Sequence, residues 1–321
     1  MRRVTGTARV LGLFAAVAFF AAACGSSRTP VDPASIGNVQ APLPASVNTA
    51  PPPANGQAAT DCDTRSLAPS SAIPAGSTMA EIKQRGRLIA GVDSSTFLFG
   101  FLDPAKGDFE GFDIDIVKQI ANALFGDWRD HVQWKAIPSS SREDMLTSGQ
   151  VDIVVRTYSI TCDRLQKVNF SSTYYVAGQR VLVQKSKGFR GLADLRDKKV
   201  CSAQDSTSLT NLAKAPERPI PVSVRNWADC LVMLQQGQVD AVSTDDTILA
   251  GMARQDPNLE VVGPRLTEED YGVGIPKGHE DMVRYVNYVL DNVRNGNAWR
   301  QSYSAWLSEL GSASPPSVTY R

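Results

Sequence analysis

The sequence predicts an α/β protein made of two units, each with a largely parallel sheet that is covered by helices on both faces. The first observation is the segment Val151–Val155, whose β-branched residues are as densely placed as in a strand buried on both sides. The second is the alternation of strand-like and helix-like segments over residues 87–155, which is repeated over residues 199–262. A chain of 321 residues is long enough to contain two such cores.

In the first unit, strands are expected at residues 87–93 and 132–134, and helices from residue 111 and over residues 141–148. Asp113 is expected to be the N-cap of the first of these helices. With Asp115 it is expected to lie at a solvated helix start, rather than to bind a metal or to act in catalysis. The short helix is expected to end at Gly149, because glycine is common just after a helix.

The second unit is expected to follow a crossing at residues 178–185. Its expected strands are 199–202, 220–224, 239–243 and 259–262, and its expected helices are 206–214, 227–236 and one that ends near 254. A return crossing is expected at residues 271–275, followed by two closing helices at 279–295 and 298–310. Two units joined by two crossings leave a cleft between them, and this geometry permits hinge closure around a small ligand.

Composition excludes several classes of function. Lysine and arginine together number 33, as do aspartate and glutamate, so the formal net charge is zero and nucleic-acid binding is not expected. The two histidines, His131 and His279, are far apart and lack the spacing of metal ligands, so no metal is expected. The sequence contains no Walker, dinucleotide or G-x-S-x-G fingerprint, and no cofactor is expected.

The N-terminal region is typical of an exported protein. Residues 1–23 are predicted to be a signal peptide, because two arginines precede an apolar run shorter than the roughly 20 residues of a membrane span. The small residues before Cys24 resemble a lipobox, in which Cys24 is lipidated; simple cleavage after Ala23 is the alternative. Residues 24–60 are rich in proline and alanine and are expected to form a disordered tether. The expected location is the extracytoplasmic face of the cell membrane, with a lipid anchor.

Polar residues follow Val151–Val155 directly, namely Thr157, Ser159, Thr161 and Arg164. In open α/β sheets, ligands bind beyond the carboxyl ends of such strands, so these residues are candidates for a binding site. The alternative is a solvated loop in which Arg164 pairs with Asp163 or Glu143.

The segment Ser159-Ile-Thr-x-x-Arg164, followed by V-x-F-S-x-x-Y-Y from Val168 to Tyr175, resembles a signature of the polar amino-acid-binding proteins of ABC importers. These are family 3 extracellular solute-binding proteins, and the sequence is most similar to the actinobacterial glutamine-binding lipoproteins. The resemblance covers roughly residues 87–310. It implies the two-lobed, type II periplasmic-binding-protein-like fold with two hinge crossings. The implied division is a first lobe at 61–178, a second lobe with hinge strands at 179–270, C-terminal helices of the first lobe at 271–311, and a tail at 312–321.

The resemblance also implies how an amino acid would be held at its α-carboxylate. Arg164 would clamp the carboxylate, because a guanidinium can donate two parallel hydrogen bonds to it. Ser159 and the helix start at Ser206 and Thr207 would assist, the latter through backbone donors. In this family the turn before that helix is usually Gly-Thr-Thr, whereas here it is Asp205-Ser206-Thr207.

The α-ammonium would bind a carboxylate. Asp245 matches the family's acceptor in V-D-A-V-x-x-D and is preferred to Asp246, although Asp245 could also serve as a helix N-cap. Other implied ligand-binding residues are Thr157, Asp93, Arg156 and Phe97. Phe97 would replace the aromatic side chains that glutamine-binding members have at the positions of Thr96 and Ser139.

Arg156 bears on which amino acid binds. At this position the glutamine-binding members have a small residue near the ligand side chain. Here the arginine either is neutralised by an acid such as Asp205 or faces the cleft. In the second case, aspartate and glutamate would bind at least as tightly as asparagine and glutamine, because a cation in a closing pocket requires an anion.

The four cysteines other than Cys24 allow three pairings. In the family fold, Cys162 belongs to the first lobe, whereas Cys201 and Cys230 belong to the second. Because a bond between lobes would obstruct closure, the resemblance implies the disulfides Cys62–Cys162 and Cys201–Cys230.

The resemblance therefore implies a monomeric, non-catalytic binding protein. It would capture aspartate, glutamate, asparagine or glutamine and deliver the amino acid to an ABC permease. The first alternative is a sensor that signals the bound amino acid to a membrane partner without transport. The second is an enzyme on the same fold, since related scaffolds include a dehydratase.

Overall fold

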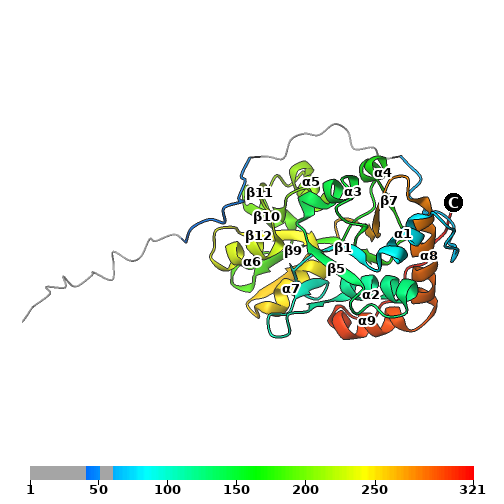
Figure 1. The fold of residues 1–321 in the computed structure, drawn as a ribbon. Helices are drawn as coiled ribbons and strands as arrows, with labels where there is room; N and C mark the ends of the chain where they lie inside the picture. The colour runs from blue at the N-terminus through cyan, green and yellow to red at the C-terminus, as the bar shows by residue number, and fades with distance from the viewer. Residues whose placement is uncertain (1–40, 51–60) are drawn as a thin grey trace, which may run out of the picture. The chain divides into compact units, whose positions relative to one another are not determined.

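The computed structural model describes residues 41–50 and 61–321 (Figure 1). Residues 42–321 form one compact unit, which contains two five-stranded mixed sheets with helices packed against them. The predicted α/β fold is therefore confirmed. The predicted signal peptide, the predicted lipidation site Cys24 and much of the predicted tether lie outside the described residues. No helix among the described residues is long and apolar enough to cross a membrane.

The first sheet has the strand order β5-β1-β6-β15-β7. Its strands are β1 (Leu88–Val92), β5 (Val132–Ala136), β6 (Ile153–Val154), β7 (Val168–Phe170) and β15 (Gly274–Pro276). β1 is parallel to β5 and β6, as predicted, and β15 is antiparallel to β6 and β7. A small antiparallel sheet, formed by β2 (Ser95–Thr96), β3 (Gly100–Leu102) and β4 (Phe109–Glu110), follows β1.

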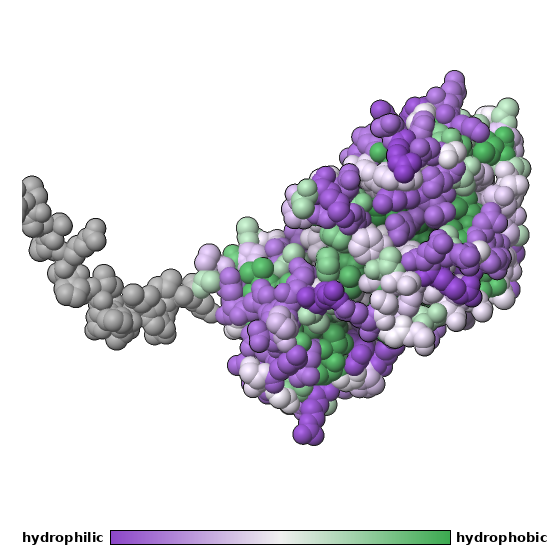
Figure 2. All heavy atoms as spheres, turned by 90° about the horizontal axis from the view of Figure 1, so that it is seen from below, coloured by the Kyte–Doolittle hydropathy of each residue, from purple (hydrophilic) through white to green (hydrophobic). Residues whose placement is uncertain are grey.

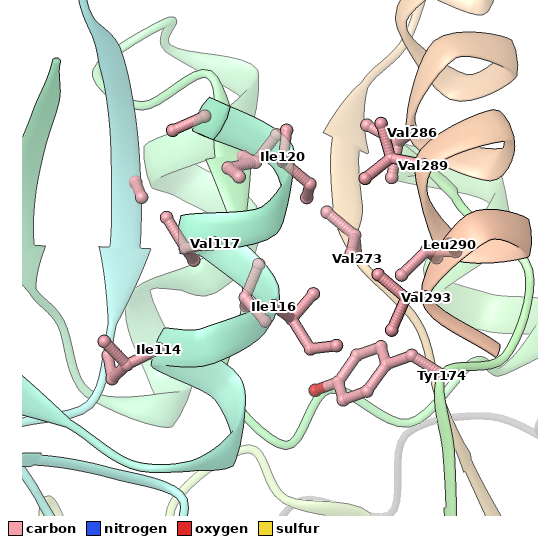
Figure 3. Close-up of a cluster of buried hydrophobic side chains, with 14 of the residues drawn as sticks. Ile114, Ile116, Val117, Ile120, Tyr174, Val273, Val286, Val289, Leu290 and Val293 are labelled. Atoms are coloured by element: carbon pink, nitrogen blue, oxygen red, sulfur yellow. The ribbon is translucent and has the colours of Figure 1, made fainter. Parts of the chain in front are cut away.

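The helices of this first lobe are α1 (Thr78–Arg85), α2 (Phe112–Phe125), α3 (Arg142–Thr147), α4 (Cys162–Lys167), α8 (Glu280–Asn295) and α9 (Ala298–Trp306), with 3₁₀ turns at Ser139–Ser141 and Ser308–Leu310. Apolar side chains of α2 and α8 fill the space between these two helices, together with Val273 and Tyr174 (Figure 3). The apolar face of α2 is thus buried in the core of the lobe.

The prediction that Asp113 is a solvated helix cap is wrong. The N-cap of α2 is Gly111, and Asp113 is buried. Its carboxylate accepts hydrogen bonds from the Tyr174 hydroxyl (2.7 Å) and from the backbone N–H of Thr157 (2.8 Å). Burial is the main cause that raises the pKa of Asp113 to about 7. Asp113 therefore holds the polar segment that follows β6 in place from inside the lobe.

The second sheet has the strand order β11-β10-β12-β9-β13. Its strands are β9 (Gln179–Gln184), β10 (Lys199–Ala203), β11 (Ile220–Val224), β12 (Ala241–Asp245) and β13 (Leu259–Val262). Its helices are α5 (Thr207–Lys214), α6 (Trp227–Gln235) and α7 (Asp246–Gln255), with 3₁₀ turns at Lys185–Lys187 and Leu192–Leu195. β10, β11 and β12 are parallel, whereas β9 is antiparallel to β12 and β13.

The expected crossings at residues 178–185 and 271–275 lie a few residues too late in the chain. Residues 179–184 form β9, and residues 274 and 275 belong to β15, and both are inner strands of the two sheets. In β9, Val181 and Val183 lie in one hydrophobic cluster and Leu182 lies in another, so both faces of this strand are buried. The chain passes between the lobes through the antiparallel pair β8 (Tyr175–Ala177) and β14 (Glu269–Tyr271), which belongs to neither sheet.

The prediction of a disordered tether up to residue 60 is wrong for the stretch around Asn48. Backbone hydrogen bonds of 2.8 Å join Asn48 and Ser223 in both directions, and Val47 packs against the core of the second lobe. The reason is that β11 is an edge strand, whose outer backbone groups are available to another extended segment. At the other end of the chain, Tyr320 binds the first lobe through hydrogen bonds to Asp291 and Arg294.

Both implied disulfides, Cys62–Cys162 and Cys201–Cys230, are confirmed. Each bond lies within one lobe.

On the face shown in Figure 2, hydrophilic residues predominate and hydrophobic residues form separate small patches.

Candidate ligand-binding site

A cavity of about 10 Å³ lies where the two lobes meet. The first lobe contributes Ser139, Arg142, Thr157, Ser159 and Arg164, and the second contributes Ser206, Thr207, Ser208, Trp227, Thr244, Asp245 and Ile248. Such a volume holds about one water molecule, so an amino acid can enter only if the lobes separate.

Contacts between the lobes identify this arrangement as closed. Arg142 and Arg164 of the first lobe donate to the backbone carbonyl of Asp205 in the second lobe, at 3.2 and 3.1 Å. On another side of the cleft, the backbone of Phe97 lies so close to α7 that a Cβ on Gly251 would be 2.3 Å from the Phe97 carbonyl oxygen.

Arg164 lies in α4, whose N-cap Thr161 accepts a hydrogen bond from the Arg164 backbone N–H. The guanidinium donates to the Ser159 carbonyl at 2.7 Å, and its central carbon lies 4.8 Å from the centre of the Tyr158 ring. The alternative of a solvated loop is wrong, because Arg164 is buried and Glu143 pairs with Lys167.

Arg142, at the start of α3, is a second buried guanidinium that the sequence analysis missed. Its central carbon lies 4.3 Å from the centre of the same Tyr158 ring, and its Nε donates to the Ser139 carbonyl. Burial, followed by the neighbouring charge of Arg164, lowers the pKa of Arg142 to about 9. No carboxylate in the part of the chain that the structure describes forms an ion pair with Arg142 or Arg164. Nothing in the local sequence distinguishes Arg142 from a surface arginine on a short helix.

Asp245 is the last residue of β12 and faces the two arginines across the cavity. One carboxylate oxygen, Oδ2, accepts a hydrogen bond from the Tyr271 hydroxyl. The other, Oδ1, is buried and has no hydrogen-bond partner among residues 41–50 and 61–321. Burial and then the charge of Glu269 raise the pKa of Asp245 to about 7. Asp245 occupies the N-cap position of α7 but makes no side-chain capping bond.

The neighbouring carboxylate, Asp246, is oriented differently. It forms an ion pair with Arg265 at 2.7 Å and accepts from the Gly178 backbone N–H. It borders a separate surface cavity of about 370 Å³ that also includes Tyr175, Trp299 and residues near the C-terminus. The structure therefore brings Asp245, and not Asp246, to the cavity that contains the arginines.

Two residues with a left-handed backbone conformation border the arginines. Thr157 has a φ of 39°, which is strained for a β-branched residue, and the Asp113 carboxylate holds its N–H. Asp205 has a φ of 55°, a conformation that aspartate tolerates. Aspartate can therefore take the place of the glycine in the Gly-Thr-Thr turn, and the turn in this chain is Asp205-Ser206-Thr207.

The start of α5 is only partly available to a ligand. Ser206 is the N-cap, and its hydroxyl donates to the Ala203 carbonyl and accepts from the Leu209 N–H. The Thr207 hydroxyl donates to Glu269 at 3.1 Å. Both residues line the cavity, but their hydroxyls already have partners.

Arg156 and Asp93 do not line the cavity, which corrects the expectation that they contact the ligand. Arg156 is fully buried and pairs with Asp93, at 2.6 Å, instead of with Asp205. Its Nε donates to the Ile137 carbonyl. Asp93 additionally accepts from the hydroxyl of Thr96. Because its charge is neutralised by Asp93, Arg156 does not favour acidic amino acids as ligands.

Phe97 borders a second cavity of about 10 Å³, which adjoins the first. The two cavities share only Trp227 and Ile248 as lining residues. The second one is mainly apolar, since Phe97, Leu231 and Met252 line it.

Two α/β lobes that are joined by two strands and enclose a polar cavity define the type II class of periplasmic-binding-protein-like folds. The chain belongs to the bacterial extracellular solute-binding proteins, family 3, which residues 88–309 match.

Named relatives support this assignment. The ABC transporter glutamine-binding protein GlnH of Bacillus subtilis is 37% identical over 234 residues, which are 72% of this chain and 85% of that protein. The glutamate-binding protein GluB of Corynebacterium efficiens is 31% identical over 211 residues, covering 62% and 71% of the two chains. The structure of an ancestral arginine-binding protein bound to glutamine has a TM-score of 0.65 and 31% identity, covering 70% of this chain and 98% of that one.

Proposed function

We propose that this protein captures a polar or acidic α-amino acid outside the cytoplasm by closure of its two lobes, and delivers it to an ABC permease. One observation carries the proposal: two buried guanidiniums without a carboxylate partner in the described residues face the unpartnered, buried oxygen of Asp245. One relative named as an ABC transporter glutamine-binding protein and another named as a glutamate-binding protein support it. Lipid attachment at Cys24 would keep the protein beside the permease.

The charges in the cavity are complementary to the α-carbon substituents of an amino acid. Arg164 would bind the α-carboxylate, because burial makes an unpaired guanidinium costly and a carboxylate neutralises it. Asp245 Oδ1 would accept a hydrogen bond from the α-ammonium. This bond would give Oδ1 the partner that it lacks, and the positive charge would favour the ionised carboxylate. Tyr158 supports both arginines from one side through its ring.

The side chain of the ligand also follows from the charges. Among the charged residues that line the cavity, two arginines and one aspartate leave one positive charge after a zwitterionic ligand has bound. A side-chain carboxylate would neutralise the remaining charge on Arg142, and an amide oxygen would accept a hydrogen bond from it, whereas a cationic side chain would be repelled. The proposed ligands are therefore aspartate, glutamate, asparagine and glutamine.

Calorimetric titration of the purified protein with each common amino acid tests the proposal. We expect binding of one molecule per chain for at least one of these four, and none for lysine or arginine. Failure of all four to bind would overturn the proposal. Loss of uptake in a deletion strain would support delivery to a permease, whereas normal uptake with a lost cellular response would identify a sensor instead.

Binding is expected to depend on pH through Asp245. The ammonium requires the ionised carboxylate, but with no ligand bound the raised pKa of about 7 keeps Asp245 protonated at lower pH. Affinity should therefore be constant above about pH 7 and fall by up to about tenfold per pH unit below it. The free energy of unfolding of the ligand-free protein should change in the opposite direction. A carboxyl group whose pKa is raised by folding stabilises the folded protein at acidic pH, and this stabilisation is lost as the pH rises through about 7.

Calorimetry between pH 5 and 8 checks the dependence of affinity. Asp245→Asn should bind weakly at every pH and lose the dependence. A wild-type affinity that is constant from pH 5 to 8 would show that Asp245 does not receive the ammonium.

A further inference from the structure

One polar group at the cleft has no role in the site as described above. It is the indole N–H of Trp227. This residue is the first of α6, and it is only 3% exposed. The Nε1 atom is buried and has no hydrogen-bond acceptor among the described residues. An unpaired buried donor costs free energy, and most buried polar groups in proteins are hydrogen-bonded. Two tryptophans of the first lobe do have hydrogen-bond acceptors. Trp299 Nε1 donates to the Tyr174 carbonyl, and Trp306 Nε1 donates to Asp115.

The position of Trp227 connects the charged part of the site with its apolar part. Its side chain borders both the cavity that contains Arg164 and Asp245 and the adjoining cavity that contains Phe97 and Met252. An amino acid whose α-carbon substituents occupy the first cavity would extend its side chain past Trp227 toward the second. The indole thus lies beside the path of the ligand side chain and not beside the α-carbon substituents.

In the closed structure, none of the described residues accepts the indole hydrogen. The Ser95 and Thr96 hydroxyls beside the second cavity donate to Asp93, and the Gln255 amide nitrogen donates to the Gly251 carbonyl. The remaining lone pairs of these side chains do not reach Trp227 Nε1. The other residues that line the second cavity are largely apolar, including Phe97, Leu231 and Ile248. A ligand atom can provide the acceptor that the described residues do not.

We infer that the Trp227 indole N–H donates a hydrogen bond to a side-chain oxygen of the bound amino acid, and that Trp227 determines specificity for ligands with such an oxygen. This inference rests on the proposed function. The ligand side chain would then have two partners, the indole donor of Trp227 on the second lobe and the positive charge of Arg142 on the first. Ligands with apolar side chains of the same length leave the donor unpaired and bind less tightly.

The variant Trp227→Phe tests the inference, because it removes the donor and keeps a smaller aromatic ring, and a comparison of ligands with and without a side-chain oxygen separates the loss of the donor from the loss of ring area. Calorimetry of the full mature protein would compare asparagine and glutamine with leucine and norleucine, which have similar shapes and no side-chain oxygen. The affinities of the last two would be obtained by competition if they are weak. We expect roughly five- to tenfold weaker binding of asparagine and glutamine, a larger loss for aspartate and glutamate, and a clearly smaller loss for leucine and norleucine.

Trp134→Phe is the matched control. Trp134 lies in β5 at the edge of the first sheet and packs against Phe109, away from both cavities, so the same replacement should leave every affinity unchanged. A second measurement uses the indole N–H signals in nuclear magnetic resonance spectra of protein with labelled tryptophan. The signal that Trp227→Phe removes should shift strongly with asparagine or glutamine and little with alanine.

Equal losses for all ligands would show that only the ring contacts the ligand and would overturn the inference. Unchanged affinities, or an indole signal that does not respond to asparagine and glutamine, would also overturn it and would leave a trapped water as the partner of the indole. These outcomes leave amino-acid binding intact, whereas a wild-type protein that binds no amino acid would instead refute the proposed function.

Discussion

Replacing Arg164 with alanine is expected to weaken binding of every amino-acid ligand by roughly 30- to 4000-fold, because truncation of one member of a buried charge pair costs about 2–5 kcal/mol. Arg164 differs from most buried arginines in that no carboxylate of the described residues forms an ion pair with it. The free energy of unfolding without ligand should therefore change little, since the variant removes an uncompensated charge as well as hydrogen bonds to Ser159 and Asp205. Calorimetry and denaturant unfolding of the same variant measure the two effects.

Arg164→Lys is the informative companion variant. It keeps the positive charge but removes the planar fork that donates two hydrogen bonds to a carboxylate, so it should recover only part of the lost affinity. Arg294→Ala serves as the control in the first lobe, because Arg294 does not line the cavity and bonds instead to Asp291 and Tyr320. That variant should lower stability and spare affinity. Affinity retained within tenfold by Arg164→Ala would assign the carboxylate to Arg142 or to another group.

The second large effect is expected from Gly251→Ala, a replacement that an isolated helix would favour. Gly251 lies inside α7 with ordinary helical geometry, so alanine should raise helix stability by about 0.5–1 kcal/mol. In the closed protein, however, the new Cβ would lie 2.3 Å from the carbonyl oxygen of Phe97 in the other lobe. Such a contact is too short, and the lobes must move apart to relieve it.

Because the clash exists only when the lobes are closed, it should act on binding and not on folding. Overpacking of this kind costs about 1–3 kcal/mol, which corresponds to roughly 5- to 150-fold weaker ligand binding. The melting temperature without ligand should stay the same or rise. Small-angle X-ray scattering with saturating ligand should report a larger radius of gyration for the variant than for the wild type. Unchanged affinity with unchanged scattering would show that closure does not bring Phe97 against α7.

Several features of this protein could be predicted from the sequence because they depend on local patterns. The strands at residues 220–224 and 259–262 and the helices that begin at Thr207 and Trp227 follow from apolar periodicity with polar residues at the ends. The burial of Val151–Val155 follows from the density of β-branched residues. The two disulfides followed from the family resemblance, and the structure contains both.

The tertiary structure alone decided how buried charges are distributed, because the partner of a charge is a neighbour in space and not in sequence. Arg156 follows a buried strand and Arg142 begins a short helix, and neither context indicates a partner: Arg156 is neutralised by Asp93, whereas Arg142 has no carboxylate partner in the described part of the chain. In the same way, Asp113 binds the Thr157 backbone inside the first lobe. Asp245 retains one oxygen without a partner in the described residues. Desolvation makes each of these charges costly, so the packing of two distant lobes, which no local pattern encodes, determines which of them a ligand must satisfy.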